Sequence, residues 1–142
     1  MSIVAPESAS VSSPPTASAL LSTPAPRLRP ALIDGVRIFV ECPAWCVEDH
    51  VAANQKFLAD LDHGGEMVDL TLTDVDGEVQ LLGHVQLSCE PGSSVPELRV
   101  PHLYVADGGG FDAFVPLDGA EAFADGLVAA AERVRAMARS AG

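Results

Sequence analysis

Hydrophobic and polar residues alternate along the middle of the chain, as they do in a strand with one buried and one exposed face. In MVDLTLT, residues 67–73, three aliphatic residues share one face and the polar residues between them share the other. Residues 78–89 continue the alternation as one long strand, in which Gly83 marks a kink or a bulge. DVDG at 74–77 is typical of a turn, so the two strands are predicted to form a hairpin. The apolar residues expected on one face of the returning strand are Val79, Leu81, Val85, Leu87 and Cys89.

Shorter runs on either side of this hairpin extend the pattern. VRIFVEC at 36–42 alternates loosely, and ELRVPHLYVA at 97–106 and FDAFVP at 111–116 have the composition of returning strands. Pro101 either confines its strand to a sheet edge or marks a break. Together these runs predict an antiparallel β-meander of about four to five strands.

The C-terminal segment changes to helical spacing. Its apolar residues recur every three or four positions, at Phe123, Leu127, Ala130, Val134 and Met137. Asp118 followed by Glu121 predicts a capping box at the start of this helix. We therefore expect an α+β fold in which the amphipathic helix covers the apolar face of the meander, with a further short helix after the CPAWC motif at 42–46.

The first 33 residues have a different composition from the rest. Residues 1–33 are rich in Ser, Pro and Ala, and their aliphatic residues follow no sustained period. Proline interrupts helices, and no continuous apolar face is available to pack. The prediction is a disordered N-terminal tail over 1–33 and a single α+β domain over 34–142.

The net charge of −12 is concentrated in the predicted domain. From Glu41 to Asp125 there are 17 acidic residues against Lys56 and Arg99, which gives −15 for that segment. An acidic surface repels phosphate, so neither nucleic acid nor an anionic membrane is an expected partner. The same surface suits a basic protein partner.

Cysteine usage and the absence of targeting signals indicate a compartment. The N-terminus lacks the basic residues that open a secretory signal, and no apolar run reaches membrane-spanning length. Three cysteines are an odd number for a secreted disulfide framework. These features predict a cytoplasmic protein.

The stretch ECPAWCVEDH, residues 41–50, places Cys42, Cys46 and His50 at four-residue intervals. Cysteine and histidine bind zinc tetrahedrally at about 2.0 to 2.3 Å, so the ligand atoms must converge closely. Cys46 and His50 on one helix would be about 6 Å apart, whereas Cys42 would be about 12 Å from His50 along it. Because Pro43 favours an extended residue before it and a helix after it, Cys42 is expected to end a strand at the helix start.

A fourth zinc ligand is needed, and the candidates are His63, His84, His102 and Cys89. His63 is favoured, because His84 falls on the polar side of its strand and Cys89 on the apolar side. One unbroken helix over 43–62 would separate His63 from His50 by roughly 20 Å. The hypothesis therefore requires a break between them, for which Asn54 is the suggested position.

The motif CPAWC, followed by His50 and His63, a β-rich region and an alanine-rich final helix that begins LDGAEAFADGL, resembles an actinobacterial family of uncharacterised domains with a CPxWC…H…H signature. The resemblance covers about residues 40–140, and the signature residues that it implies are Cys42, Pro43, Trp45, Cys46, His50 and His63. It implies no activity, because the family has no assigned function.

Several interpretations of the cysteines stay open. They can be a structural zinc site, small buried hydrophobic residues, a reversible disulfide, or part of a catalytic zinc or Cys–His pair. The leading hypothesis is a small, non-enzymatic, zinc-stabilised interaction or regulatory domain. The alternative is a metal- or thiol-dependent enzyme that uses Cys42, Cys46 and His50. Dimerisation through the C-terminal helix is compatible with either.

Overall fold

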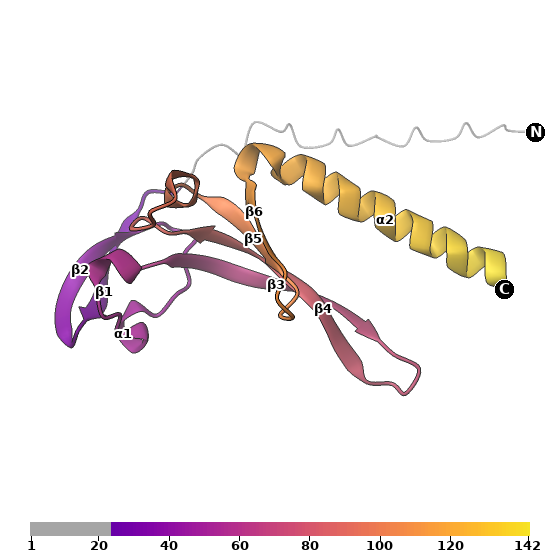
Figure 1. The fold of residues 1–142 in the computed structure, drawn as a ribbon, viewed down its shortest axis with the longest axis horizontal. Coiled ribbons are helices and arrows are strands. Elements are labelled where there is room, and N and C mark those ends of the chain that lie inside the picture. The colour runs from indigo at the N-terminus through magenta and orange to yellow at the C-terminus, as the bar shows by residue number, and fades with distance from the viewer. Residues whose placement is uncertain (1–23) are drawn as a thin grey trace, which may run out of the picture.

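The computed structural model of the protein describes residues 24–142. Six strands form two antiparallel sheets, a two-stranded sheet of β1 and β2 and a four-stranded sheet in the order β3-β4-β5-β6 (Figure 1). The elements are β1 (Arg27–Ile33), β2 (Val36–Cys42), α1 (His50–Ala53), β3 (His63–Thr73), β4 (Val79–Cys89), β5 (His102–Ala106), β6 (Asp112–Pro116) and α2 (Ala120–Ala141). The α+β class, the C-terminal helix and the short helix after CPAWC are confirmed.

The first strand corrects the predicted start of the domain. Residues 27–33 were assigned to the tail, but they pair with β2 over its whole length, from Arg27 opposite Cys42 to Ile33 opposite Val36. Both residues of the connecting turn, Asp34 and Gly35, have positive φ angles of 49° and 78°, which suits a two-residue hairpin loop. Pro30 is tolerated because every strand of a two-stranded sheet is an edge strand. The predicted tail over residues 1–23 lies outside the described residues.

The central hairpin of β3 and β4 forms as its sequence predicts. The turn is closed by the amide of Asp74, which donates to the carbonyl of Glu78 at 3.0 Å, and by the amide of Gly77, which donates to the carbonyl of Asp74 at 3.1 Å. The carboxylate of Asp74 also accepts hydrogen bonds from the amides of Asp76 and Glu78. β5 and β6 then continue the meander, and β5 begins directly after Pro101.

A bulge in β4 divides its apolar face in two. Val85 pairs with Val68, but beyond Gly83 the register shifts, so Leu81 pairs with Thr71. Directly opposed residues point to the same face, and positions 68 and 71 of β3 point to opposite faces. Leu81 and Val85 therefore lie on opposite faces, which corrects the prediction of one shared face along the strand.

The C-terminal helix α2 does not cover the sheet. It leaves β6 through a short 3-10 helix, Leu117–Gly119, and projects away from the strands (Figure 1). Its apolar residues stay accessible, with Leu127, Val134 and Met137 exposed by 39%, 62% and 67%. The predicted capping box is also absent: Gly119 occupies the cap position, because the chain is already helical at Asp118 and offers no extended residue to cap from. No helix in residues 24–142 is both long and apolar enough to cross a membrane.

Few side chains of the described residues are fully buried. The buried apolar residues of the described chain are Ala31, Cys42, Cys46, Leu61, Cys89 and Ala106, and the buried polar ones are His50, His63 and His102. The largest fully buried side chains are the two cysteines of the CPAWC motif. The described residues therefore bury the predicted site and few large aliphatic side chains.

Candidate metal centre

Cys42 and Cys46 are positioned by the end of β2 and the turn that follows it. Cys42 is the last residue of the strand, as predicted from Pro43. The amide of Cys46 donates to the carbonyl of Pro43 at 3.1 Å, so the chain turns tightly between the two cysteines. The turn brings both thiols to the same buried space, where they are 0% and 1% exposed.

His50 is the first residue of α1, which differs from the predicted arrangement. Cys46 and His50 were expected on one helix, but the helix begins only at His50. The reason is Asp49, whose carboxylate accepts from the amides of Val51 and Ala52 at 3.0 Å and so caps the helix at this point. Cys46 approaches His50 from the preceding turn instead.

His63 reaches the cluster because the chain reverses after α1. Asn54 ends the helix in the left-handed conformation, with φ of 41°, which confirms the predicted break. β3 then starts at His63, which pairs with Cys89 at the far end of β4. The amide of Val47 donates to the carbonyl of Gly64 at 2.8 Å and holds the cysteine loop against β3.

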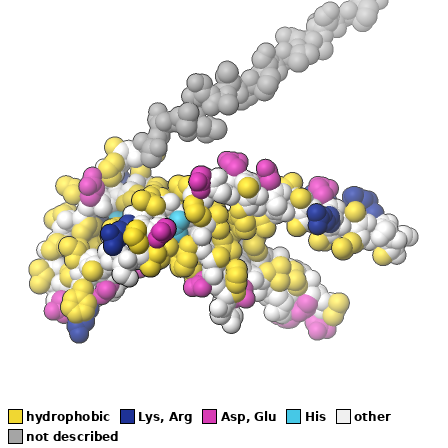
Figure 2. All heavy atoms as spheres, turned by 45° about the horizontal axis from the view of Figure 1, so that its top comes forward, with side chains coloured by type: hydrophobic (Ala, Val, Ile, Leu, Met, Phe, Trp, Pro, Cys, Tyr) yellow, Lys and Arg dark blue, Asp and Glu magenta, His cyan; other side chains and the backbone are white. Residues whose placement is uncertain are grey.

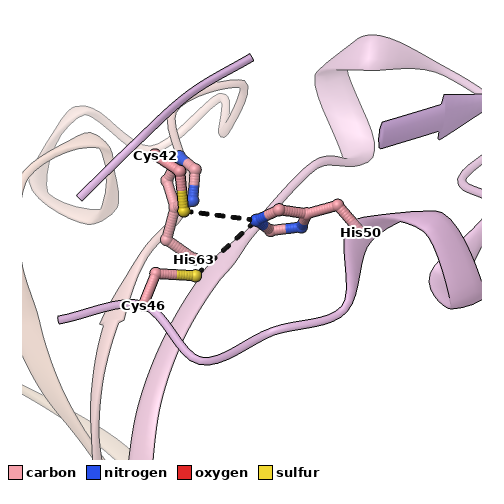
Figure 3. Close-up of side chains that lie close together, drawn as sticks. All are labelled: Cys42, Cys46, His50 and His63. Carbon is pink, nitrogen blue, oxygen red and sulfur yellow. Dashed lines mark hydrogen bonds between the residues drawn. The ribbon is translucent and has the colours of Figure 1, made fainter. Parts of the chain in front are cut away.

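The four predicted ligands converge on one point (Figure 3). Their candidate ligand atoms all lie within 4.8 Å of one another. The Sγ atoms of Cys42 and Cys46 are each 3.6 Å from Nε2 of His50, and the rings of His50 and His63 stand edge to face with centroids 5.3 Å apart. An ion bound tetrahedrally at about 2.3 Å to sulfur and about 2.1 Å to nitrogen would hold such atoms about 3.6 Å apart. The cluster can therefore hold a metal ion with only small side-chain movements.

His63 has a buried nitrogen atom without a hydrogen-bond partner among the described residues. His63 is 4% exposed, and its Nδ1 atom has no hydrogen-bond partner among the described residues. An unpartnered buried polar atom is unfavourable, and a bound cation would satisfy it. The ring also meets Trp45 edge-on at 6.5 Å, so the indole shields this side of the cluster.

The electrostatics of the cluster favour neutral side chains. Burial lowers the pKa of His50, as does the nearby guanidinium of Arg29, and burial also lowers the pKa of His63. Burial raises the pKa of the Cys42 thiol, and the neighbouring Cys46 adds to this effect. Neutral imidazoles are ready to bind a metal, whereas the Cys42 thiol must release its proton first.

Arg27 and Arg29 on β1 support the cysteine loop, and they were missed in the sequence. The Arg29 side chain donates to the carbonyl of Cys46, and the Arg27 side chain to that of Ala44, each at 3.1 Å. Both arginines lie in the segment assigned to the tail. The turn formed by Asp34 and Gly35 was the available signal, because an Asp-Gly pair between β-rich segments favours a hairpin and so brings β1 beside the loop.

The remaining candidates for the fourth ligand lie outside the cluster. His84 is half-buried on β4 opposite Ala106, and His102 is buried on β5, where its Nδ1 atom lies 2.9 Å from the carbonyl of Val100. The Cys89 thiol donates to the carbonyl of Arg99 at 3.2 Å. All three cysteines are free thiols, so the reversible disulfide is not formed in this structure.

A pocket of about 440 Å³ opens beside the two histidines of the cluster. Its lining includes the carboxylates Glu48, Asp62, Glu90 and Asp112 and the aromatic rings of Tyr104 and Phe114. Burial raises the pKa of Asp62, and so do the surrounding carboxylates, of which Glu90 has the largest effect. The pocket is thus electronegative and suits a cation rather than an anion.

Comparison with known protein families assigns the chain to a family. It belongs to the family described as Domain of unknown function (DUF6907), whose model matches residues 15–142. The match spans the cysteine–histidine cluster, both sheets and α2. The comparisons with curated proteins and with solved structures gave no match. The expected membership of a family of uncharacterised domains is confirmed at this level.

Proposed function

We propose that this DUF6907 domain is a non-enzymatic interaction or regulatory module whose fold is stabilised by a zinc ion bound to Cys42, Cys46, His50 and His63. The observation that carries the proposal is the convergence of four ligand atoms within 4.8 Å, on side chains that are each no more than 5% exposed. The carry-over of the CPxWC…H…H signature to these same four positions adds support.

Zinc is the ion that suits this set of donors. Thiolate sulfur is a soft ligand and disfavours Ca²⁺ and Mg²⁺, which bind oxygen. Two thiolates and two imidazoles in a tetrahedral arrangement are typical of structural zinc. The thiolates would also neutralise the charge of the ion, so that it carries no net charge into the buried site.

A structural role follows from the position of the ligands. Cys42 ends β2, whereas His63 begins β3, so one ion would link the two sheets. The buried set of the described residues contains no large aliphatic side chain except Leu61. A domain with so small an apolar core gains stability from a metal link, and the free energy of binding becomes free energy of folding.

The pocket beside His50 and His63 favours a second candidate, a metal- or thiol-dependent enzyme. A catalytic zinc keeps one coordination position for water or substrate. Four protein ligands would fill the tetrahedron and leave no such position, and each of the four side chains is no more than 5% exposed. The structural role is therefore the better supported of the two.

The acidic surface supports a basic partner. The pocket lined by Glu48, Asp62, Glu90 and Asp112 offers carboxylates to a lysine or arginine side chain of another protein. We also infer a reducing, cytoplasmic location and an actinobacterial origin. The free cysteines support the first, and the resemblance supports the second.

Metal analysis of the purified chain tests the proposal. We expect one zinc per chain, loss of that zinc in Cys42→Ser, and a lower melting temperature when a strong chelator is added to the parent protein. Cys89→Ser is the matched control, because Cys89 is also buried but lies outside the cluster. A metal-free protein whose melt is unchanged by chelator would overturn the proposal. An open coordination position detected by binding of azide or cyanide to the Co²⁺-substituted protein would favour the enzyme.

A further inference from the structure

The helix α2 carries a regular apolar seam that the described chain leaves uncovered. Its 22 residues run for about 33 Å. Alternating steps of three and four along it connect Ala120, Phe123, Leu127, Ala130, Val134, Met137 and Ala141. This is the a/d spacing of a coiled coil, and the position following each d residue is alanine, at 124, 131 and 138. These small alanine side chains widen the apolar surface, so that a second helix can pack closely along the seam.

The opposite side of the helix is polar. Asp125, Glu132 and Arg139 repeat at intervals of seven and form a solvated row. Arg135 pairs with Glu132 on this exposed side. The helix α2 is therefore amphipathic, although no part of residues 24–142 packs along its length. Only Phe123, near the start, is half-buried among the larger seam residues.

The charges of α2 point to the identity and orientation of what covers the seam. Residues 120–130 hold Glu121 and Asp125 and no basic residue, which gives −2. Residues 131–141 hold three arginines and Glu132, which gives +2. A second copy of the same helix in antiparallel orientation would place each acidic half beside a basic half. Because Asp125, Glu132 and Arg139 face away from the seam, this attraction acts between the overall charges of the two halves and not through ion pairs across the seam. A parallel copy would place like charges together.

We propose that α2 pairs with α2 of a second copy of this chain in an antiparallel two-helix contact. The proposal does not depend on the metal centre. With the seam centred between residues 130 and 131, alanines lie at the symmetry axis and allow close approach of the two helices. Leu127 of each copy is then level with Val134 of the other, and the aromatic ring of Phe123 lies near Met137. This isologous arrangement closes as a dimer and leaves no seam for further association.

The sheet lies beside one end of this contact. A side chain at Gly119, just before α2, would touch Val115 of β6, so the start of the helix is close to the sheet. Val115 belongs to an apolar face with Leu103 and Leu87, all only half-buried. The C-terminal end of the second copy's helix would arrive at this edge and reduce its exposure.

Sedimentation equilibrium of the full chain over about 1 µM to about 1 mM tests the pairing. We expect a monomer–dimer equilibrium that Leu127→Glu weakens at least about thirtyfold, because it places an unpaired charge in the seam. Val128→Glu is the matched control: Val128 is 64% exposed and adjacent, but lies off the seam, and its replacement is expected to leave the dimer intact. Met137→Glu is a second variant that should weaken the dimer. Circular dichroism and zinc content verify that each variant remains folded.

The orientation has its own test in salt dependence. Raising the ionic strength from about 0.05 M to about 0.5 M should weaken an antiparallel dimer, because the attraction between unlike halves is screened. A parallel dimer would instead tighten. A chain that stays monomeric throughout, or a dimer insensitive to Leu127→Glu and Met137→Glu, would overturn the proposal. Either outcome leaves the zinc content unaffected, so it is distinguishable from failure of the metal site.

Discussion

His63 stands edge-on to His50, with ring centroids 5.3 Å apart, although His50 opens α1 and His63 opens β3. The contact exists because the chain reverses at Asn54 and because the carbonyl of Gly64 accepts from the amide of Val47. Figure 3 shows both thiols directed toward the ring of His50, with His63 beside Cys42. The reversal therefore also brings the start of β3, which carries His63, close to the end of β2, which carries Cys42.

Replacement of His63 tests whether this contact belongs to a metal site. We expect His63→Ala to lose bound zinc and to destabilise the metal-loaded protein by about 4 kcal/mol or more, the range for loss of a structural metal. The single tryptophan, Trp45, meets the His63 ring at 6.5 Å, so its fluorescence should report zinc addition in the parent protein and not in the variant. His84→Ala is the control, because His84 lies outside the cluster. Retained zinc in His63→Ala would exclude His63 as a ligand.

Metal binding should release protons. Burial and the neighbouring Cys46 raise the pKa of the Cys42 thiol above its ordinary value of 9.0, so the thiol is protonated in the metal-free protein near neutral pH. Binding as a thiolate expels that proton, and affinity is expected to rise about tenfold per pH unit for each proton released. Calorimetric titration with zinc in buffers of different ionisation enthalpy measures the number of protons released per zinc ion bound. A value of zero at neutral pH would show that Cys42 does not bind as a thiolate.

The strands and the site residues were predictable because their signals are local. Alternation in 67–73 and the turn at 74–77 define the central hairpin without reference to the rest of the chain. Pro43 predicted that Cys42 ends a strand, and residue type and spacing selected the four side chains that the structure brings together. The start of α1 was missed because Cys46 was expected in the first helical turn, whereas Asp49 caps the helix and His50 is its first residue. Local sequence therefore identified the clustered side chains but gave an incorrect path of the chain between Cys46 and His50.

Features that depend on distant contacts were not predictable from sequence patterns. Arg29 supports the loop only because β1 pairs with β2, and a segment with Pro30 among its residues shows no clear alternation. The apolar seam of α2 predicted an amphipathic helix, but periodicity does not specify which surface receives it. The described chain leaves that seam exposed (Figure 2 shows hydrophobic side chains along the projecting helix). The proposed dimer would cover it with α2 of a second copy.

Asn54 controls the reversal that the site requires. It adopts φ of 41°, and its side-chain oxygen accepts from the amide of Gly35 at 3.0 Å. Asn54→Ala should destabilise the protein by about 2 kcal/mol, since it combines left-handed strain with the lost hydrogen bond. Asn54→Gly removes only the hydrogen bond and should cost about 1 kcal/mol or less. Denaturant unfolding of both variants separates the two contributions. Equal destabilisation by the two variants would show that left-handed backbone strain contributes nothing to the effect of Asn54→Ala.

Two glycines of the chain should respond oppositely to the same substitution. A Cβ at Gly92 would overlap the carbonyl of Ala59, so Gly92→Ala should destabilise the protein by about 1 to 3 kcal/mol. A Cβ at Gly126, inside α2, meets nothing within 4 Å, and alanine there should stabilise the helix by about 0.5 to 1 kcal/mol. Urea unfolding measures both changes. A neutral Gly92→Ala would indicate that the two loops are not packed together in solution.

The turn between β3 and β4 should contribute a pH-dependent part of the stability. The side chain of Gln80 donates to the carboxylate of Asp74, and this bond and those from the turn amides lower the pKa of Asp74 below its ordinary value of 3.8. A lowered pKa in the folded state means that the stabilisation is present in full above the unfolded value of 3.8. It is lost as pH falls from there through the folded pKa, because the unfolded chain then takes up the proton more readily.

Asp74→Asn isolates this contribution. The side chain introduced at position 74 carries no charge at any pH. The variant should therefore melt below the parent protein near neutral pH, and the difference in melting temperature should shrink as the pH falls below 3.8. Any loss of zinc in acid affects both proteins alike and cancels from the difference. Asp76→Asn in the same turn is the control, because among the described residues its carboxylate is not an acceptor that holds the turn. A difference that stays constant into acid would show that the charge of Asp74 does not stabilise the hairpin.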